Sequence, residues 1–129
     1  MSEKIIIGCD HAAFEMKERV KAFLIVNDYE VTDIGTFNGQ SVDYPDFGIK
    51  VASEVSCGNY SRGLLICGTG IGMSIVANRF PGVRAALCGD LFSTIMSRRH
   101  NDANVLVMGA RVTGEGLALE LVKIGRAHV

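Results

Sequence analysis

The feature that most restricts the fold of this chain is the apolar run "GLLIC" at residues 63–67, which leads directly into a cluster of glycines. Five successive residues without a polar side chain fit a strand that is covered on both faces, as strands in parallel sheets usually are. Gly68, Gly70 and Gly72 follow the run before a further apolar segment begins. These residues predict a buried strand that ends at a cysteine and continues into a glycine-rich turn.

Strand and helix patterns alternate along the rest of the chain. Short apolar runs predict strands at 4–8, 29–35, 63–67, 82–89 and 104–110. Amphipathic segments predict helices at 13–26, about 46–57, 73–80, 91–101 and 114–125. This order favours an α/β fold, a three-layer α/β/α sandwich with a five-stranded parallel sheet in a Rossmann-like arrangement.

Size and composition limit the classes of function. A length of 129 residues fits one domain, and 48% apolar residues supply a core without disulfide bonds. A net charge of −1 gives no basic surface for nucleic acid, and no apolar run approaches the ~20 residues of a membrane span. The four cysteines lack C-x-x-C and zinc-type spacing. We therefore expect a cytoplasmic protein with free thiols, without a metal, nucleic-acid or membrane partner.

Ligands of open parallel sheets bind at the carboxyl ends of the strands. Polar groups follow the first, third and fifth predicted strands, and the end of the fourth helix adds two more. We expect all of them to converge at one edge of the sheet: Asp10, His11, Cys67, Gly68, Thr69, Gly70, Ile71, Gly72, His100, Asn101 and Arg111.

Two interpretations of Cys67 remain open from the residues alone. Free cysteines are often buried and inert, which we expect of Cys9, Cys57 and Cys88. At Cys67, however, the start of a helix favours a thiolate, and Thr69 stands close enough in sequence to bond the sulfur. The N–H groups of the glycine turn suit either a phosphate or an enolate oxyanion.

Other motifs fit this turn less well. A dinucleotide-binding G-x-G-x-x-G would need glycine at Met73, although Asp90 lies where a ribose-binding acid would stand, so nucleotide binding stays open. The Walker G-K-[ST] is absent, and a cysteine phosphatase would need arginine at Met73. His11 could cap a helix or contact a ligand, and His100 could lie at a solvated helix end.

Several longer strings, in this order, resemble the ribose-5-phosphate isomerase B family from about residue 4 to 123. They are "GCDHAAF", "DYPD", "ICGTGIGMSIVANRFPGVRAAL" and "SRRHNDANVLVMGAR". The resemblance implies an intramolecular oxidoreductase that interconverts aldose and ketose phosphates without cofactor or metal. It also implies a homodimer or tetramer.

The resemblance assigns roles to the predicted site residues. Cys67 matches the base that abstracts a proton to give a cis-enediolate, with Thr69 as its hydrogen-bond partner, and His100 matches the group that opens the furanose ring. Positions that match the backbone and amide groups around the oxyanion are Gly68, Thr69, Gly70, Ile71, Gly72 and Asn101. Positions that match contacts to sugar hydroxyls and phosphate are Asp10, His11 and Arg111.

We therefore expect isomerisation of ribose 5-phosphate and ribulose 5-phosphate in the pentose phosphate pathway. One alternative keeps the chemistry and changes the sugar to allose 6-phosphate or galactose 6-phosphate. An alternative of another class is a non-catalytic module that binds a nucleotide or a sugar phosphate.

The end of the chain departs from the family pattern. The family continues through a tryptophan-containing stretch to arginines that complete the phosphate site, whereas this chain has no tryptophan and ends in "IGRAHV". That string matches a translated sequencing adapter. We expect one isomerase domain at 1–123 with an incomplete last helix, a non-native tail at 124–129, and weakened substrate binding as a result.

Overall fold

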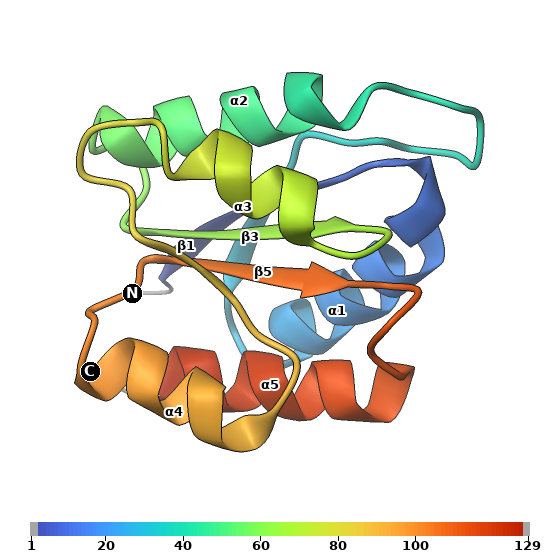
Figure 1. Cartoon of the computed structure of the whole chain (residues 1–129). Helices are drawn as coiled ribbons and strands as arrows, with labels where there is room; N and C mark the ends of the chain where they lie inside the picture. The colour runs from blue at the N-terminus through green and yellow to red at the C-terminus, as the bar shows by residue number, and fades with distance from the viewer. Residues whose placement is uncertain (1–2, 128–129) are drawn as a thin grey trace.

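Five parallel strands form a single sheet in the computed structural model, which describes residues 3–127 (Figure 1). The strands are β1 (Lys4–Cys9), β2 (Glu30–Asp33), β3 (Arg62–Cys67), β4 (Ala85–Leu87) and β5 (Val105–Gly109). They lie in the order β2-β1-β3-β5-β4. The prediction of a five-stranded parallel sheet is confirmed, and the apolar run at 63–67 occupies its central strand.

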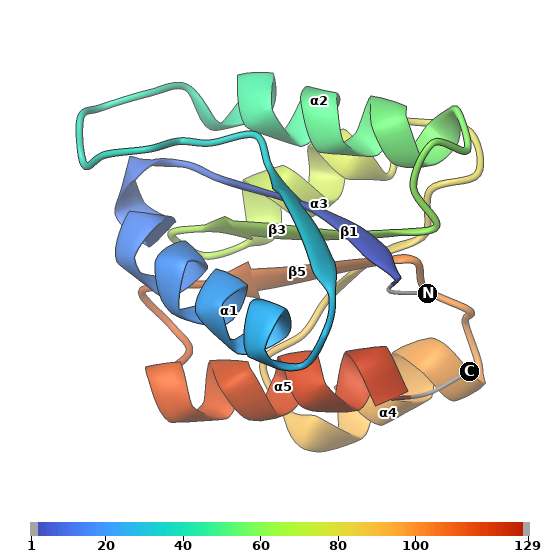
Figure 2. The same cartoon turned by 180° about the vertical axis from the view of Figure 1, so that it is seen from behind.

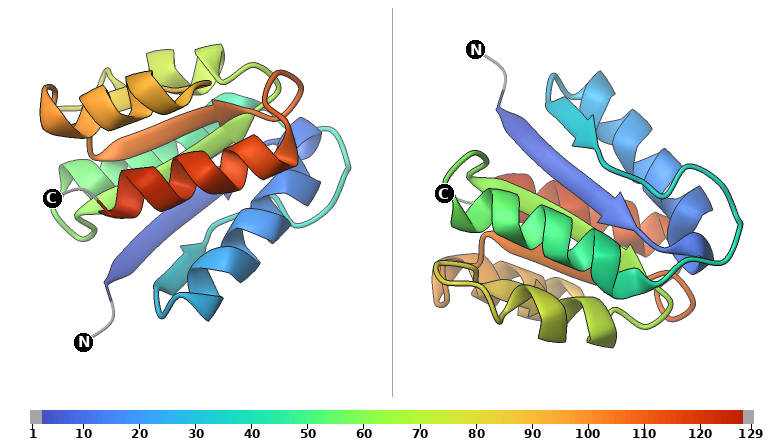
Figure 3. Two further views of the ribbon diagram at one scale, coloured as in Figure 1. Left: turned by 90° about the horizontal axis from the view of Figure 1, so that it is seen from below. Right: turned by 90° about the horizontal axis from the view of Figure 1, so that it is seen from above.

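Helices cover both faces of this sheet. They are α1 (Phe14–Val26), α2 (Tyr44–Ser56), α3 (Ile71–Ala77), α4 (Leu91–Arg99) and α5 (Glu115–Ala127), and a 3₁₀ turn, η1 (His11–Ala13), precedes α1. Figure 3 shows α1, α4 and α5 on one face and α2 and α3 on the other, which gives the expected three layers. Within residues 3–127, no helix combines the length and apolar character needed to cross a membrane.

Side chains of the central strand divide between two hydrophobic cores. Leu64 and Ile66 belong to the core under α1 and α5, whereas Leu65 and Cys67 belong to the core under α2 and α3. Both cores need apolar residues, since each face of β3 is covered by helices. This is why the run has no polar alternation.

Some element boundaries differ from the sequence prediction. The predicted strand at 82–89 is reduced to three residues, because Gly82 takes a positive φ of 76° and Asn78 bonds both the N–H and the carbonyl of Ala85. The third helix begins at Ile71, two residues earlier than predicted, directly after Gly70. Pro45 lies in the first turn of α2, as its position in the sequence indicates.

Two glycines allow the β3–α3 connection to lie against the end of β5. A Cβ atom at Gly109 would stand 2.5 Å from the backbone of Thr69. Gly70 has a φ of 84°, and a Cβ there would meet Leu87 at 2.4 Å and the backbone of Met108 at 3.0 Å. The connection can turn tightly over β5 only because both positions lack a side chain.

We predict that Gly109→Ala destabilises the fold by about 2 kcal/mol, because the added methyl group must push backbone away from backbone. Urea unfolding followed by circular dichroism measures this change. Gly116→Ala is the matched control, since Gly116 has no atom within 4 Å of a built Cβ. Equal stability of the two variants would contradict the prediction.

Candidate active site

The loops after β1 and β3 diverge to opposite faces of the sheet. The chain leaves β1 for α1 and leaves β3 for α3, which lie on different sides (Figures 1 and 2). Cys9 pairs with Ile66 in the sheet register, and the N–H of Asp10 bonds the carbonyl of Ile66 at 3.3 Å. Asp10 and Cys67 therefore lie side by side at the switch point, where open parallel sheets bind ligands.

The sulfur of Cys67 accepts a hydrogen bond from the backbone. The N–H of Gly70 donates to Sγ at 3.2 Å, and the side chain of Cys67 is buried. An N–H that points at a sulfur stabilises the negatively charged form of that sulfur. Within the described residues, the N–H groups of Gly68, Thr69 and Gly72 have no hydrogen-bond partner. A thiol and several unpaired donors thus lie in one loop.

The other three cysteines lack this arrangement. Burial raises the pKa of Cys9 to about 12 despite the nearby Lys17, and burial also raises the pKa of Cys88. Cys57 is exposed at the end of α2. Burial of Cys9 and Cys88 agrees with the expectation for free cysteines, whereas the exposure of Cys57 differs from it.

Thr69 does not make the bond that the sequence analysis expects of it. Its Oγ1 accepts from the N–H of Ile71 at 3.2 Å, while the sulfur of Cys67 is bonded by Gly70. The reason is local geometry, because the hydroxyl is turned to the N–H of the first residue of α3, and Gly70, with its positive φ, places its own N–H at the sulfur. Two of the five expected loop donors, Gly70 and Ile71, are therefore already occupied.

Polar side chains surround this loop on the β1 and β5 sides. The Asp10 carboxylate accepts from the N–H of Ala12 at 3.1 Å and so caps η1, as its position suggests. The N–H of Arg111 bonds the carbonyl of Gly68, and its side chain lies 3.6 Å from where a Cβ at Gly68 would be. Among the described residues no carboxylate pairs with Arg111.

His11 bonds to the connection between β2 and α2. Its Nδ1 accepts from the N–H of Val42 at 3.1 Å. Because a backbone N–H can only donate, Nδ1 carries no proton in this arrangement and Nε2 carries it. His11 therefore presents a donor on the face turned away from Val42.

The prediction that His100 and Asn101 converge with Cys67 is wrong within one chain. Both follow the end of α4, and the carbonyl of Asn101 accepts from Arg84 at 2.6 Å, near the start of β4. Because α4 runs antiparallel to the strands, its end lies at the amino edge of the sheet (Figure 1). The length of β5, about 13 Å, separates this edge from Cys67.

Asp90 has a structural role at the start of α4. It caps α4, where its carboxylate accepts from the N–H of Ser93 at 2.7 Å and from the Ser93 hydroxyl at 2.9 Å. These hydrogen bonds lower the pKa of Asp90. The carboxylate that would bind a ribose is thus bonded to its own helix.

Two features near the site were missed by sequence reasoning. The ring of Tyr44 lies over the glycine loop, 2.4 Å from where a Cβ at Gly72 would be. Lys17, in an amphipathic helix, is fully buried and bonds Asp33. The motif "DYPD" contains Tyr44 but does not by itself indicate a contact with the glycine loop. A lysine in an amphipathic helix is expected to be exposed, so the sequence does not indicate the burial of Lys17.

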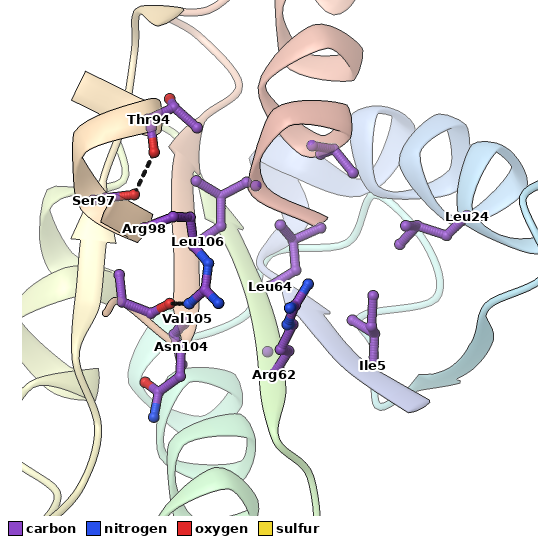
Figure 4. A pocket seen from close by; sticks show the side chains of 14 residues that line it. Ile5, Leu24, Arg62, Leu64, Thr94, Ser97, Arg98, Asn104, Val105 and Leu106 are labelled. Carbon is purple, nitrogen blue, oxygen red and sulfur yellow. Dashed lines mark hydrogen bonds between the residues drawn. The ribbon is translucent and has the colours of Figure 1, made fainter. Parts of the chain in front are cut away.

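A cavity of about 50 Å³ lies at the amino edge, away from Cys67 (Figure 4). Its apolar wall is made by Ile5, Leu24, Leu64, Val105, Leu106 and Val122. Arg98, beside it, is bonded to the carbonyl of Ala103. Polar side chains line the rest of the cavity, namely Arg62, Thr94, Ser97, Arg98 and Asn104. The cavity is not the candidate site because it lies at the opposite end of the strands from Cys67. In the described part of the chain, no group of three or more His, Cys, Asp or Glu could hold a metal.

A buried thiol that accepts an N–H hydrogen bond, with further N–H donors and an arginine in neighbouring segments, is suited to a small anionic substrate. Comparison with known proteins identifies the class more closely. The family model described as Ribose/Galactose Isomerase matches residues 5–124. The chain belongs to this family, whose members are sugar-phosphate isomerases and therefore enzymes.

Individual relatives agree with this assignment. Ribose-5-phosphate isomerase B of Escherichia coli K12 is 46% identical over 120 residues, which cover 93% of this chain and 80% of that protein. D-erythrulose-4-phosphate isomerase of Pectobacterium atrosepticum is 42% identical over 119 residues, or 92% of this chain and 78% of that protein. The solved structure of ribose-5-phosphate isomerase B from Clostridium thermocellum superposes with a TM-score of 0.95 at 50% identity, covering 97% of this chain and 84% of that one.

The ion pairs of Asp33 predict how stability depends on pH. Burial opposes the charged form, but hydrogen bonds from Lys17, Gly35 and Lys21 outweigh it and hold the pKa of Asp33 below its usual value. The charged carboxylate therefore stabilises the fold at neutral pH, and this contribution is lost as the pH falls below about 4.

We predict that Asp33→Asn lowers the free energy of unfolding by about 3 kcal/mol at pH 7 and flattens its decline below pH 4. Urea unfolding at a series of pH values measures both effects. Asp46→Asn, an exposed carboxylate in α2, serves as the control. An unchanged acid dependence in Asp33→Asn would contradict the assignment.

Proposed function

We propose that the chain interconverts ribose 5-phosphate and ribulose 5-phosphate through a cis-enediolate. The observation that carries the proposal is the hydrogen bond from the Gly70 N–H to the sulfur of Cys67 at the switch point of the sheet. Membership of a family of sugar-phosphate isomerases supplies the class of reaction. This membership also sets aside the alternative of a non-catalytic binding module.

In the proposed reaction the thiolate of Cys67 removes the proton from C2 of the open-chain aldose. The same thiol then returns a proton to C1. The C2 hydroxyl loses its proton and the C1 oxygen gains one, so that the ketose forms without net gain or loss of atoms. Negative charge builds up on an oxygen of the enediolate between these steps. The unpaired N–H groups of Gly68, Thr69 and Gly72 are suited to bind that oxygen.

The remaining polar groups suit the two ends of the substrate. The side chain of Arg111 has no carboxylate partner among the described residues, so its charge is available for a phosphate. The Nε2–H of His11 is a second donor for that phosphate. Asp10, beside Cys67, accepts from sugar hydroxyls.

We propose further that His100 and Asn101 reach the site from a second copy of the chain. Both lie at the amino edge of their own sheet, whereas Cys67 lies at the carboxyl edge, about 13 Å away along the strand direction alone. A two-fold axis across the strands makes the strands of two copies antiparallel, and the amino edge of one copy then meets the carboxyl edge of the other. His100 of that copy opens the furanose ring, and Asn101 joins the donors to the enediolate oxygen.

An exposed apolar patch beside β4 is suited to this contact. It consists of Ile71, Ile75, Leu87, Leu91 and Phe92, of which Phe92 is 70% exposed. The patch adjoins the glycine loop, because Leu87 packs against Gly70. Exposed apolar side chains that gather on one part of a surface are suited to protein–protein contacts. We propose a homodimer formed through this patch.

The sugar is the least constrained part of the proposal. The relatives include a ribose-5-phosphate isomerase and an isomerase named for D-erythrulose 4-phosphate, so one scaffold serves several sugars. We propose the five-carbon substrate because it is named for the first of these and for the similar solved structure. An isomerase of ribose 5-phosphate would serve the pentose phosphate pathway, and the four free cysteines fit the cytoplasm.

We predict that a panel of four-, five- and six-carbon aldose phosphates shows the highest kcat/KM for ribose 5-phosphate. On that substrate, Cys67→Ser lowers kcat by about a thousandfold, because the alcohol is a far weaker base than the thiolate. Cys57→Ser, the exposed control, keeps full activity. Full turnover by Cys67→Ser would overturn the assignment of the base, and a preference for another sugar would overturn the substrate.

The shared site is tested by mixing two inactive variants. We predict that Cys67→Ser and His100→Ala, each inactive alone, recover about a quarter of normal activity after joint unfolding and refolding, since half the dimers are mixed and each has one intact site. Phe92→Asp in both chains should abolish this recovery and leave monomers in size-exclusion chromatography. No recovery from dimers proven to be mixed would show that both residues act within one chain.

A further inference from the structure

Lys17 is the largest fully buried side chain among the described residues, and it is charged. Its Nζ lies 2.9 and 2.8 Å from the two carboxylate oxygens of Asp33 and 2.6 Å from the carbonyl oxygen of Thr36. The rings of Phe14 and Phe37 flank it, with centroids at 5.4 and 4.8 Å. A lysine is almost never buried this completely without a specific set of partners.

These contacts tie α1 to the connection at 34–43, which links β2 to α2. Figure 2 shows this connection extending past the carboxyl edge of the sheet, beside the start of α1. Near its end, the N–H of Val42 bonds Nδ1 of His11. Directly after it, Tyr44 packs over the glycine loop. The segment that Lys17 anchors at one end thus forms a wall of the candidate site at the other.

We propose that Lys17 is a positioning residue for phosphate binding. By fixing the Thr36 carbonyl and Asp33, it sets the path of the 34–43 connection and so keeps the Val42 N–H on His11. That bond holds the proton of His11 on Nε2, where it can be donated to the substrate phosphate. The kinetic part of this inference rests on the proposed isomerase function, whereas the protonation state of His11 does not depend on it.

The contacts of Lys17 with Asp33 and with the Thr36 carbonyl require the charge of the lysine side chain as well as its volume. A methionine at position 17 would fill most of the space but would leave the Thr36 carbonyl without its donor. A buried ion pair often adds little stability over apolar side chains of equal volume, so its use here points to geometry. Lys21 offers a matched comparison, because its Nζ contacts the same Asp33 carboxylate at 3.1 Å without a bond to Thr36.

The kinetic test compares Lys17→Met with Lys21→Met. We expect Lys17→Met to raise KM for ribose 5-phosphate about tenfold, the loss of one hydrogen bond to a charged group, and to leave kcat within about twofold. The value of kcat is retained because Cys67 and Gly70 belong to β3 and its own loop. Lys21→Met should leave both constants unchanged. A loss confined to kcat, or an equal rise of KM in both variants, would overturn the proposal.

The structural test is independent of catalysis. Nitrogen-15 spectra of the His11 ring should show the proton on Nε2 in the unmodified chain and in Lys17→Arg, and a mixture of the two neutral forms in Lys17→Met. An unchanged ring spectrum in folded Lys17→Met would overturn the proposal even if the isomerase activity is established. If Lys17→Met does not fold, Lys17→Gln, whose neutral side chain is one atom shorter and so loses the reach to the Thr36 carbonyl, provides the same readouts, and an unchanged KM and ring spectrum would overturn the proposal equally.

Discussion

The close contact between Gly109 and the backbone of Thr69 is the constraint on which the site depends. Because position 109 has no side chain, the connection after β3 can lie on the end of β5. Gly70 then turns with a positive φ and directs its N–H to the sulfur of Cys67. Among the described residues, the neighbouring N–H groups of Gly68, Thr69 and Gly72 have no hydrogen-bond partner. The chemistry proposed for Cys67 thus depends on the absence of a side chain at Gly109, in the neighbouring strand β5.

Much of the fold could be predicted from the sequence, because the spacing of apolar residues indicates the strands and helices and because Gly and Pro mark their ends. The apolar run at 63–67 identified the central strand, and Pro45 marked the start of α2. The short β4 was overestimated, because an apolar segment does not show that Asn78 closes the preceding turn with its side chain. Contacts of this kind depend on atoms that meet only in the folded chain.

The positions of candidate residues that directly follow strands could be predicted from the sequence. Positions that depend on the direction of a helix relative to the sheet could not. Asp10, Cys67 and Arg111 meet because each follows a parallel strand. His100 was placed at the same edge, although the end of a helix between parallel strands lies at the opposite one. Lys17 could not be found at all, since its burial depends on Asp33, sixteen residues away. Sequence patterns therefore located the candidate loop, whereas its supporting contacts became visible only in the three-dimensional structure.

The thiolate of Cys67 is proposed to move a proton between two carbons of the substrate. Isomerisation of ribose 5-phosphate in deuterium oxide, followed by proton NMR of the ribulose 5-phosphate formed, tests it most directly. A base that exchanges its proton with solvent places deuterium on one face of C1, and the account predicts this incorporation in the unmodified chain and its loss in a chain without the Cys67 thiol. A product that forms at full rate with no deuterium would contradict transfer through a base that exchanges its proton with solvent, and incorporation that persists without Cys67 would assign the base to another residue.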